Sequence, residues 1–147
     1  MKAFTLVEML LIVVLLAVAA GLSLPNFSKS YTQLELQNTV NILTYMMRYA
    51  QSRAITQNKK MRLLFDENSK KYQLLEENKE NYTPLIGRWG KSVIISKGVT
   101  VESLHPSIDF FPTGEIEKTD VKLCREKDCM IVTTQLQRSQ VEVLYAN

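Results

Sequence analysis

The amino-terminal segment is apolar over the length that a membrane-spanning helix requires, yet it contains one carboxylate. From Phe4 to Leu22 the only charged side chain is Glu8. About 20 apolar residues suffice to cross the hydrocarbon core of a bilayer. An ionisable group inside such a segment costs roughly 2.5–3.5 kcal/mol at the bilayer centre and less near the interface. We therefore expect the Glu8 carboxylate to have a partner.

Two interpretations of this segment need no special partner. As a plain membrane anchor it has only a thin charge bias, with Lys2 before the apolar run and Lys29 after it. As a secretory signal it has an apolar region at Met9–Leu16 and small residues for cleavage at 17–20. Against the signal, Glu8 stands where positive charge is expected, and the helical pattern continues past the cut. In either case, the Glu8 side chain would snorkel toward the headgroups.

A second helical pattern follows the apolar segment. Pro25 removes one backbone donor, so it predicts a kink in a helix that continues to about Gln57. At 1.5 Å per residue, a helix from Phe4 to Gln57 is on the order of 80 Å long. Apolar residues then recur at steps of four and three, which predicts one buried stripe. The stripe consists of Leu36, Val40, Leu43, Met47, Ala50 and Ala54.

Beyond Lys60 the pattern changes to that of short strands separated by turn residues. The strands are predicted at Met61–Phe65, Tyr72–Leu75, Ser92–Ile95, Val99–Leu104, Ser107–Phe111, Val121–Cys124, Met130–Thr133 and Val141–Leu144. The polar stretch Glu76–Gly90 is predicted to be a surface loop. So many short strands close together indicate an antiparallel sheet or two packed sheets. The fold class is therefore α+β, with a long amino-terminal helix packed on a β-rich head.

The segment Lys2-Ala3-Phe4-Thr5-Leu6-Val7-Glu8 resembles the processing site of type IV pilins and of the related pseudopilins of type II secretion. In that family a prepilin peptidase cuts before a Phe, and the matching cut here lies between Ala3 and Phe4. The resemblance implies that Phe4 carries a new, N-methylated amine, although Ala3 stands where family members normally have Gly. Pro25 matches the family's helix kink.

The resemblance also implies a partner for Glu8. In pilin-like filaments this carboxylate meets the terminal amine of a neighbouring subunit, and two charges that are costly alone in hydrocarbon become tolerable as a pair. The carboxy-terminal part is similar to the GspH/FimT group of minor pilins. The similar segments are Tyr49–Ile55 with the strand Met61–Phe65, Ile108–Gly114 and Val121–Cys124.

No catalytic set or cofactor site emerges from the sequence. His105 is the only histidine, and neither Ser103 nor Ser139 lies in a nucleophile-elbow context. No phosphate-binding glycine loop and no metal-ligand cluster is present. We therefore expect a protein that is not an enzyme, with no cofactor and no metal.

Cys124 and Cys129 are the only cysteines, and predicted strands flank both. In a hairpin with a four-residue loop they would face each other within disulfide range. Such a bridge is compatible with a compartment outside the cytoplasm. Because it closes a short loop, its stabilising effect would be modest.

Positive charge gives only weak evidence for nucleic acid. The net charge is +3 and the charges are interspersed. The cations near the end of the helix, Arg48, Arg53, Lys59, Lys60 and Arg62, are best explained as partners of its carboxy-terminal carbonyls. Some FimT-type pilins are associated with DNA uptake through a Gly-Arg-x-Arg motif. Only Arg138 matches it here, and one cation makes few phosphate contacts.

The sequence thus predicts a minor pseudopilin or minor pilin, part of a type II secretion or type IV pilus filament. The expected regions are a leader at 1–3, a transmembrane and filament-core helix at 4–24, an amphipathic continuation at 25–58 and a β-rich head at 59–147. The expected location is the inner membrane with a periplasmic head, then a periplasmic or surface filament. The expected partners are other pilin-like subunits, the prepilin peptidase and the assembly platform. The alternatives are a FimT-like pilin that binds DNA and a secreted soluble β-domain.

Overall fold

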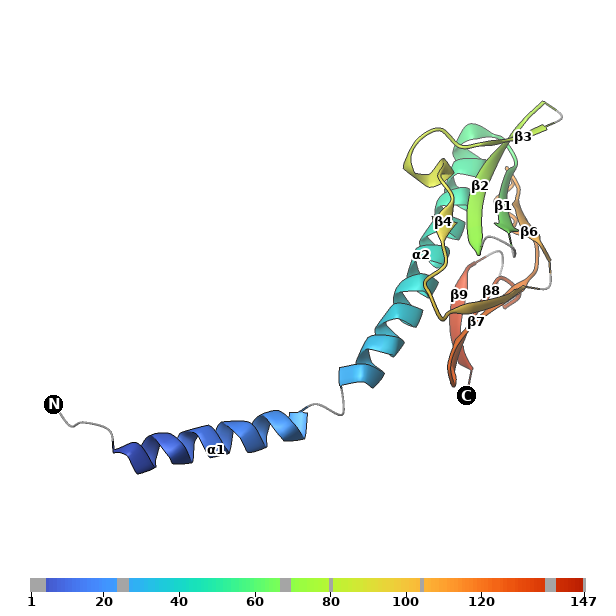
Figure 1. Cartoon of the computed structure of the whole chain (residues 1–147). Coiled ribbons are helices and arrows are strands. Elements are labelled where there is room, and N and C mark those ends of the chain that lie inside the picture. The colour runs from blue at the N-terminus through green and yellow to red at the C-terminus, as the bar shows by residue number, and fades with distance from the viewer. Residues whose placement is uncertain are drawn as a thin grey trace. The chain divides into compact units, whose positions relative to one another are not determined.

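The computed structural model describes residues 5–23, 27–66, 70–79, 81–103, 105–136 and 140–146. The chain divides into two compact units, Met1–Leu34 and Glu35–Asn147. The expected long helix is present as two helices, α1 (Leu6–Ser23) and α2 (Phe27–Gln57) (Figure 1). The predicted kink at Pro25 lies outside the described residues.

Helix α2 is amphipathic over the length that lies in the carboxy-terminal unit. All six residues of the predicted stripe, Leu36, Val40, Leu43, Met47, Ala50 and Ala54, are buried. The helix ends in a Schellman motif: Asn58 has a φ of 51°, the Lys59 N–H donates to the Ala54 carbonyl at 3.2 Å, and the Asn58 N–H donates to the Ile55 carbonyl at 3.3 Å. This cap ends the helix at Gln57, where its end was predicted, and directs the chain toward the first strand.

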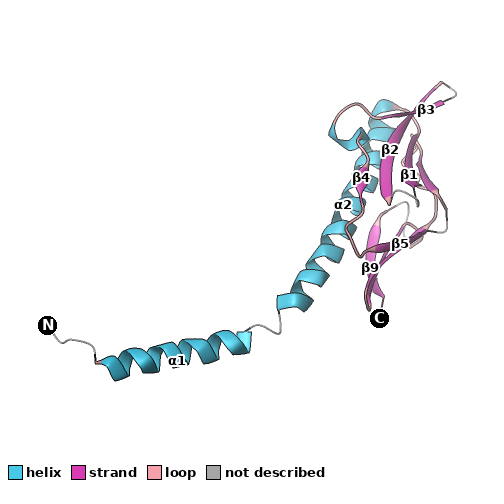
Figure 2. Ribbon diagram, in the orientation of Figure 1, coloured by secondary structure: helices cyan, strands magenta, loops and turns pink. Residues whose placement is uncertain are grey.

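Two antiparallel sheets pack with α2 (Figure 2). The first has the order β3-β2-β1-β6, and β4 also pairs with β2. The second has the order β5-β7-β8-β9. The strands are β1 (Met61–Asp66), β2 (Lys71–Asn78), β3 (Asn81–Pro84), β4 (Val93–Ile94), β5 (Thr100–Ser103), β6 (Ser107–Phe110), β7 (Asp120–Arg125), β8 (Asp128–Thr133) and β9 (Glu142–Ala146).

The core of the carboxy-terminal unit lies where the helix and the inner faces of the sheets meet. Met61, Leu63 and Phe65 alternate as buried residues along β1, and Tyr72 and Leu74 do the same on β2. Ion pairs place the sheets along α2: Arg53 pairs with Glu76 of β2, and Glu35 pairs with Arg125 of β7. The first sheet therefore lies beside the end of the helix, and the turn between β7 and β8 lies beside Glu35.

The surface loop predicted at Glu76–Gly90 is wrong in part. Strand β2 continues to Asn78, β3 returns from Asn81 to Pro84, and the two pair with Glu76 opposite Thr83. The 3-10 turn η2 (Arg88–Gly90) then follows. Polar residues at 76–83 suggested a loop, but β3 is an edge strand of a sheet whose outer face is solvated, and such strands carry polar side chains.

Candidate functional site

Helix α1 exposes its apolar side chains. Leu6, Leu11 and Leu16 are 81%, 56% and 64% exposed, and the other side chains described at 5–21 are exposed as well. Glu8 is the only charged residue of the helix. Among the described residues, no helix combines the length and the hydropathy required to cross a membrane. A contiguous apolar surface of this kind marks an interaction site.

Thr5 caps α1, and Glu8 occupies the third helical position. The Glu8 N–H donates to Thr5 Oγ1 at 3.3 Å and to the Thr5 carbonyl at 3.1 Å. This is one half of a capping box, in which a Thr accepts from the N–H of a Glu three residues later. A carboxylate in the first turn also complements the helix dipole. This local role of Glu8 was not predicted, although Thr5-x-x-Glu8 matches the sequence pattern of a capping box.

Four of the predicted site residues cannot be placed. Ala3 and Phe4, between which the processing cut is expected, lie outside the described residues, as do Pro25 and Arg138. Their roles remain predictions.

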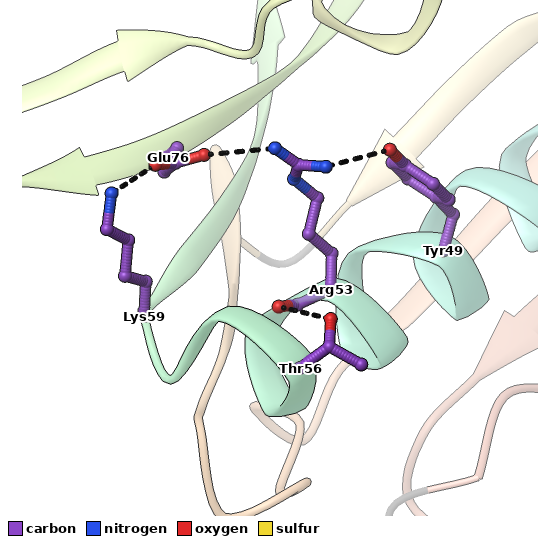
Figure 3. Close-up of polar contacts among 5 residues, drawn as sticks. All are labelled: Tyr49, Arg53, Thr56, Lys59 and Glu76. Carbon is purple, nitrogen blue, oxygen red and sulfur yellow. Dashed lines mark hydrogen bonds and ion pairs between the residues drawn. The ribbon is translucent and has the colours of Figure 1, made fainter.

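Acids of the first sheet hold the cations at the end of α2. Figure 3 shows Arg53 and Lys59 on either side of Glu76. Lys59 Nζ lies 2.5 Å from Glu76 Oε1, Arg53 Nη2 lies 3.6 Å from Oε2, and Arg53 Nη1 donates to Tyr49 Oη at 3.5 Å. The hydrogen bond from Lys59 is the main reason that the pKa of the Glu76 carboxyl is below its ordinary 4.5.

The explanation of these cations by the helix dipole is therefore wrong. The last turn of α2 contains no basic residue. Arg53 and Lys59 instead pair with Glu76, and Arg48 Nη2 donates to the carbonyl of Val141 at 3.2 Å. Their intramolecular partners also count against a nucleic-acid site at this end of the helix.

Asp109 organises a second network on the outer face of the first sheet. Arg62 donates to both of its carboxylate oxygens, at 2.6 and 2.8 Å, and Lys60 Nζ lies 2.8 Å from Oδ2. The Arg62 guanidinium also lies 4.0 Å from the ring centroid of Tyr82. Burial acts to raise the pKa of the Asp109 carboxyl, but the hydrogen bonds from Arg62 and Lys60 outweigh it, so the pKa is lowered from 3.8.

Cys124 and Cys129 are joined by a disulfide with an S–S distance of 2.08 Å. They lie directly opposite each other in the β7–β8 hairpin. The four-residue loop expected between them is shorter, because the pair Arg125–Asp128 extends the ladder. Glu126 takes a φ of 54° in the tight turn that remains. Such a φ at the tip is typical of two-residue hairpin turns.

The residues considered for catalysis do not form a catalytic set in the described structure. Ser103 Oγ donates to the backbone carbonyl of His105 at 2.8 Å rather than to its imidazole. Ser139 lies outside the described residues. No group of three or more His, Cys, Asp or Glu side chains within the described ranges could hold a metal ion.

An aromatic contact that was not predicted anchors the connection after β3. Trp89 of η2 stacks on Tyr49 of α2, with ring centroids 5.6 Å apart and planes inclined by 30°. Gln73 Nε2 donates to the Gly90 carbonyl at 2.7 Å. A Cβ at Gly90 would overlap the Leu85 carbonyl oxygen. The signal in the sequence was the Trp89-Gly90 pair, preceded by Leu85 and Ile86, in a stretch that was predicted to be a polar loop.

Comparisons with known proteins agree with this architecture. The family model described as "Type II transport protein GspH" matches residues 39–140. No curated protein sequence matches the chain.

Two kinds of solved structure share the fold. The minor pseudopilin EpsH from the type 2 secretion system of Vibrio cholerae superposes with a TM-score of 0.67 at 11% identity, over 76% of this chain and 97% of that one. The type IV minor pilin FimU of Pseudomonas aeruginosa (strain PAO1) gives a TM-score of 0.60 at 14% identity, over 76% of this chain and 90% of that one.

Proposed function

The chain belongs to the GspH family of type II transport proteins, and we infer from this that it is a pilin-like subunit of a type II secretion or type IV pilus filament. Proteins of this family are structural filament subunits and not enzymes. Family membership is consistent with a periplasmic filament and with other pilin-like subunits as partners. The steps of assembly are our proposal.

We propose that a prepilin peptidase cuts the chain between Ala3 and Phe4 and so removes residues 1–3. Residues 4–24 then hold the subunit in the inner membrane and later pack into the filament core, with an assembly platform as a further partner. Residues 25–58 continue the helix, and the β-rich head at 59–147 faces outward. The support for this division is that the described side chains of α1 are exposed and, apart from Glu8, predominantly apolar, whereas the stripe of α2 beyond Glu35 is buried.

The proposal for filament assembly depends on Glu8. It is the single charge on α1, a helix whose described side chains are exposed and otherwise predominantly apolar. The capping contact with Thr5 uses the backbone N–H of Glu8, so it does not occupy the carboxylate. We propose that the carboxylate pairs with the terminal amine of a neighbouring subunit. Such a pair would fix the register of one subunit against the next.

Two substitutions separate the charge of Glu8 from its contribution to the helix start. Glu8→Gln keeps a side chain that can complete a capping box but removes the negative charge. Thr5→Ala removes the cap and keeps the charge. The measurements are the intact mass of the membrane-fraction protein and the recovery of the subunit in sheared filaments.

We expect Glu8→Gln to be processed to a chain that begins at Phe4 and to be recovered in filaments at least about tenfold less than the wild type. We expect Thr5→Ala to assemble, since a lost cap costs only about 1 kcal/mol. Normal incorporation of Glu8→Gln would refute the pairing role. A mature chain that starts near Ala20 would instead support the secretory alternative.

DNA binding remains an alternative that rests on Arg138 alone. A salt-dependent binding assay with duplex DNA, comparing the wild type with Arg138→Ala, tests it. Because one cation makes few phosphate contacts, we expect weak binding with a shallow salt dependence and little change in the variant. A steep slope that Arg138→Ala reduces would support the DNA-uptake alternative.

A further inference from the structure

A cavity of about 410 Å³ opens between the two sheets of the carboxy-terminal unit. Its first wall comes from described residues at or next to the ends of β1 and β2, namely Phe65, Asp66, Lys70 and Lys71, and its second wall is formed by all four residues of β5. Ile95 and Val99 line it from the connection between β4 and β5. The volume lies in the range of ordinary ligand pockets. Nothing in the proposed filament assembly uses this site.

The wall formed by β5 is an unpaired strand edge. Strand β5 ends the order of its sheet and pairs only with β7 among the described strands. The Cα atoms of Cys124 and Cys129 are 4.2 Å apart, the spacing of a pair that does not exchange backbone hydrogen bonds. The backbone groups of Cys124 therefore point away from β8 and toward β5.

The register of β5 against β7 then shows which backbone N–H and C=O groups of β5 do not bond to β7. Thr100 lies opposite Cys124 and Glu102 opposite Lys122, so these two residues bond to β7. Because bonded residues alternate along a strand, the backbone N–H and C=O groups of Val101 and Ser103 point away from β7, at the cavity wall. An edge of this kind is a template for one more strand.

The cavity lining specifies which side chains an added strand would carry. Phe65, Ile95 and Val99 are buried apolar residues beneath the cavity. Of the two acids in the lining, Glu102 pairs with Lys122 at 3.7 Å, and Asp66, which lies opposite Lys71 in the β1–β2 ladder, has an interaction of its own. Lys70 and Lys71 form no ion pair with another described residue. These two lysines, beside the apolar lining, favour an added strand in which an apolar side chain is followed by a carboxylate.

We propose that this cavity binds an extended segment of a partner polypeptide, which adds to the free edge of β5 with an apolar side chain over Phe65 and Val99 and a carboxylate facing Lys70 and Lys71. The added strand would be short, since β5 has four residues and spans about 14 Å. The inference goes beyond the proposed function and does not depend on Glu8. A failure of Glu8→Gln to disturb assembly would leave it intact.

The direct test uses the full chain in detergent micelles and short fluorescent peptides of alternating valine and threonine. One peptide ends in two aspartates and a second ends in two lysines. A third is the acidic peptide with N-methyl groups on alternate residues, which blocks its backbone donors on one edge. We expect saturable binding of the acidic peptide only, with each of the others at least about tenfold weaker.

Two variants with matched controls test the two halves of the site. Val101→Pro removes an outward backbone donor without removing a bond to β7, and Val101→Ala is the control for lost packing. Lys70→Gln with Lys71→Gln removes the rim charges. Lys97→Gln with Lys91→Gln removes the same charge from exposed positions outside the cavity. We expect Val101→Pro and the rim variant to weaken peptide binding at least about tenfold and both controls to retain it.

The proposal is overturned if the acidic peptide does not bind or if the N-methylated peptide binds equally well. It is also overturned if the lysine-tailed peptide binds as tightly, if the rim variant binds normally, or if only a second copy of the chain or DNA occupies the cavity. A circular dichroism spectrum unchanged in Val101→Pro shows that a loss of binding does not come from unfolding.

Discussion

At the scale of single residues, Asp109 holds two cations, because Arg62 and Lys60 both bond to its carboxylate. Its pKa is lowered in the folded chain, so the interaction stabilises the fold above the ordinary value of 3.8 and is lost as the pH falls through the folded pKa. Glu76 is shifted in the same direction from 4.5. We therefore expect the stability of the carboxy-terminal unit to decline below about pH 4.5.

Asp109→Asn should remove part of this acid dependence and destabilise the chain at neutral pH by about 2 kcal/mol, because hydrogen bonds to charged groups are lost. Urea unfolding between pH 3 and pH 7, followed by the fluorescence of the single tryptophan, measures both effects. Asp128→Asn, at the exposed first position of β8, is the control. Equal pH slopes for Asp109→Asn and the wild type would contradict the assignment.

Gly90 is required by the space around it. A Cβ there would overlap the Leu85 carbonyl oxygen, and the Leu85 backbone is tied to β2 because its N–H donates to the Leu74 carbonyl at 3.2 Å. We expect Gly90→Ala to cost about 2 kcal/mol or more and to shift the emission of Trp89 as its stack with Tyr49 loosens. Gly21→Ala, where the new methyl group meets nothing within 4 Å, should leave both readouts unchanged. Unaltered fluorescence in Gly90→Ala would show that the loop does not anchor Trp89.

At the scale of elements, the β7–β8 hairpin joins the disulfide to α2. Arg125 follows Cys124 and pairs with Glu35 near the boundary of the two units. Thr100 Oγ1 donates to the Cys124 carbonyl at 3.2 Å, which ties β5 to the same hairpin. The bridge therefore stabilises the strand that offers the free edge as well as the contact with the helix.

Replacing both cysteines by serine should lower the free energy of unfolding by about 2 kcal/mol, because the closed loop is short. Urea midpoints with and without a reductant measure this effect, and the reductant should move the wild type toward the double variant without moving the variant itself. A wild-type midpoint unaffected by full reduction, confirmed by thiol counting, would contradict a stabilising role for the bridge.

At the scale of the whole molecule, the division into Met1–Leu34 and Glu35–Asn147 predicts that the second unit folds alone, since it contains the hydrophobic core. A chain that begins at Glu35 should be monodisperse without detergent and should keep the Trp89 emission and the cooperative unfolding of the full chain. Sedimentation velocity and urea unfolding test this. Loss of cooperative unfolding on truncation would show that residues before Glu35 contribute to the core.

The periodic elements followed from local pattern. The buried stripe of α2 and its end next to Gln57 were predicted correctly, since 3.6-residue periodicity and a capping turn are local properties. Each of the eight predicted strands overlaps an observed one. Strand β3 and the end of β2 were missed because polar residues on a solvated edge resemble a loop until the pairing strand is known.

The chain's own sequence thus determined the apolar segment with its single acid, the amphipathic helix and the β-rich class, because each depends on neighbours a few residues apart. Only the tertiary structure decided which acids hold Arg53, Lys59 and Arg62, that Trp89 stacks on Tyr49, and that β5 leaves its edge beside a cavity. These contacts join residues distant along the chain. They are set by the packing of two sheets against one helix, which local pattern does not encode.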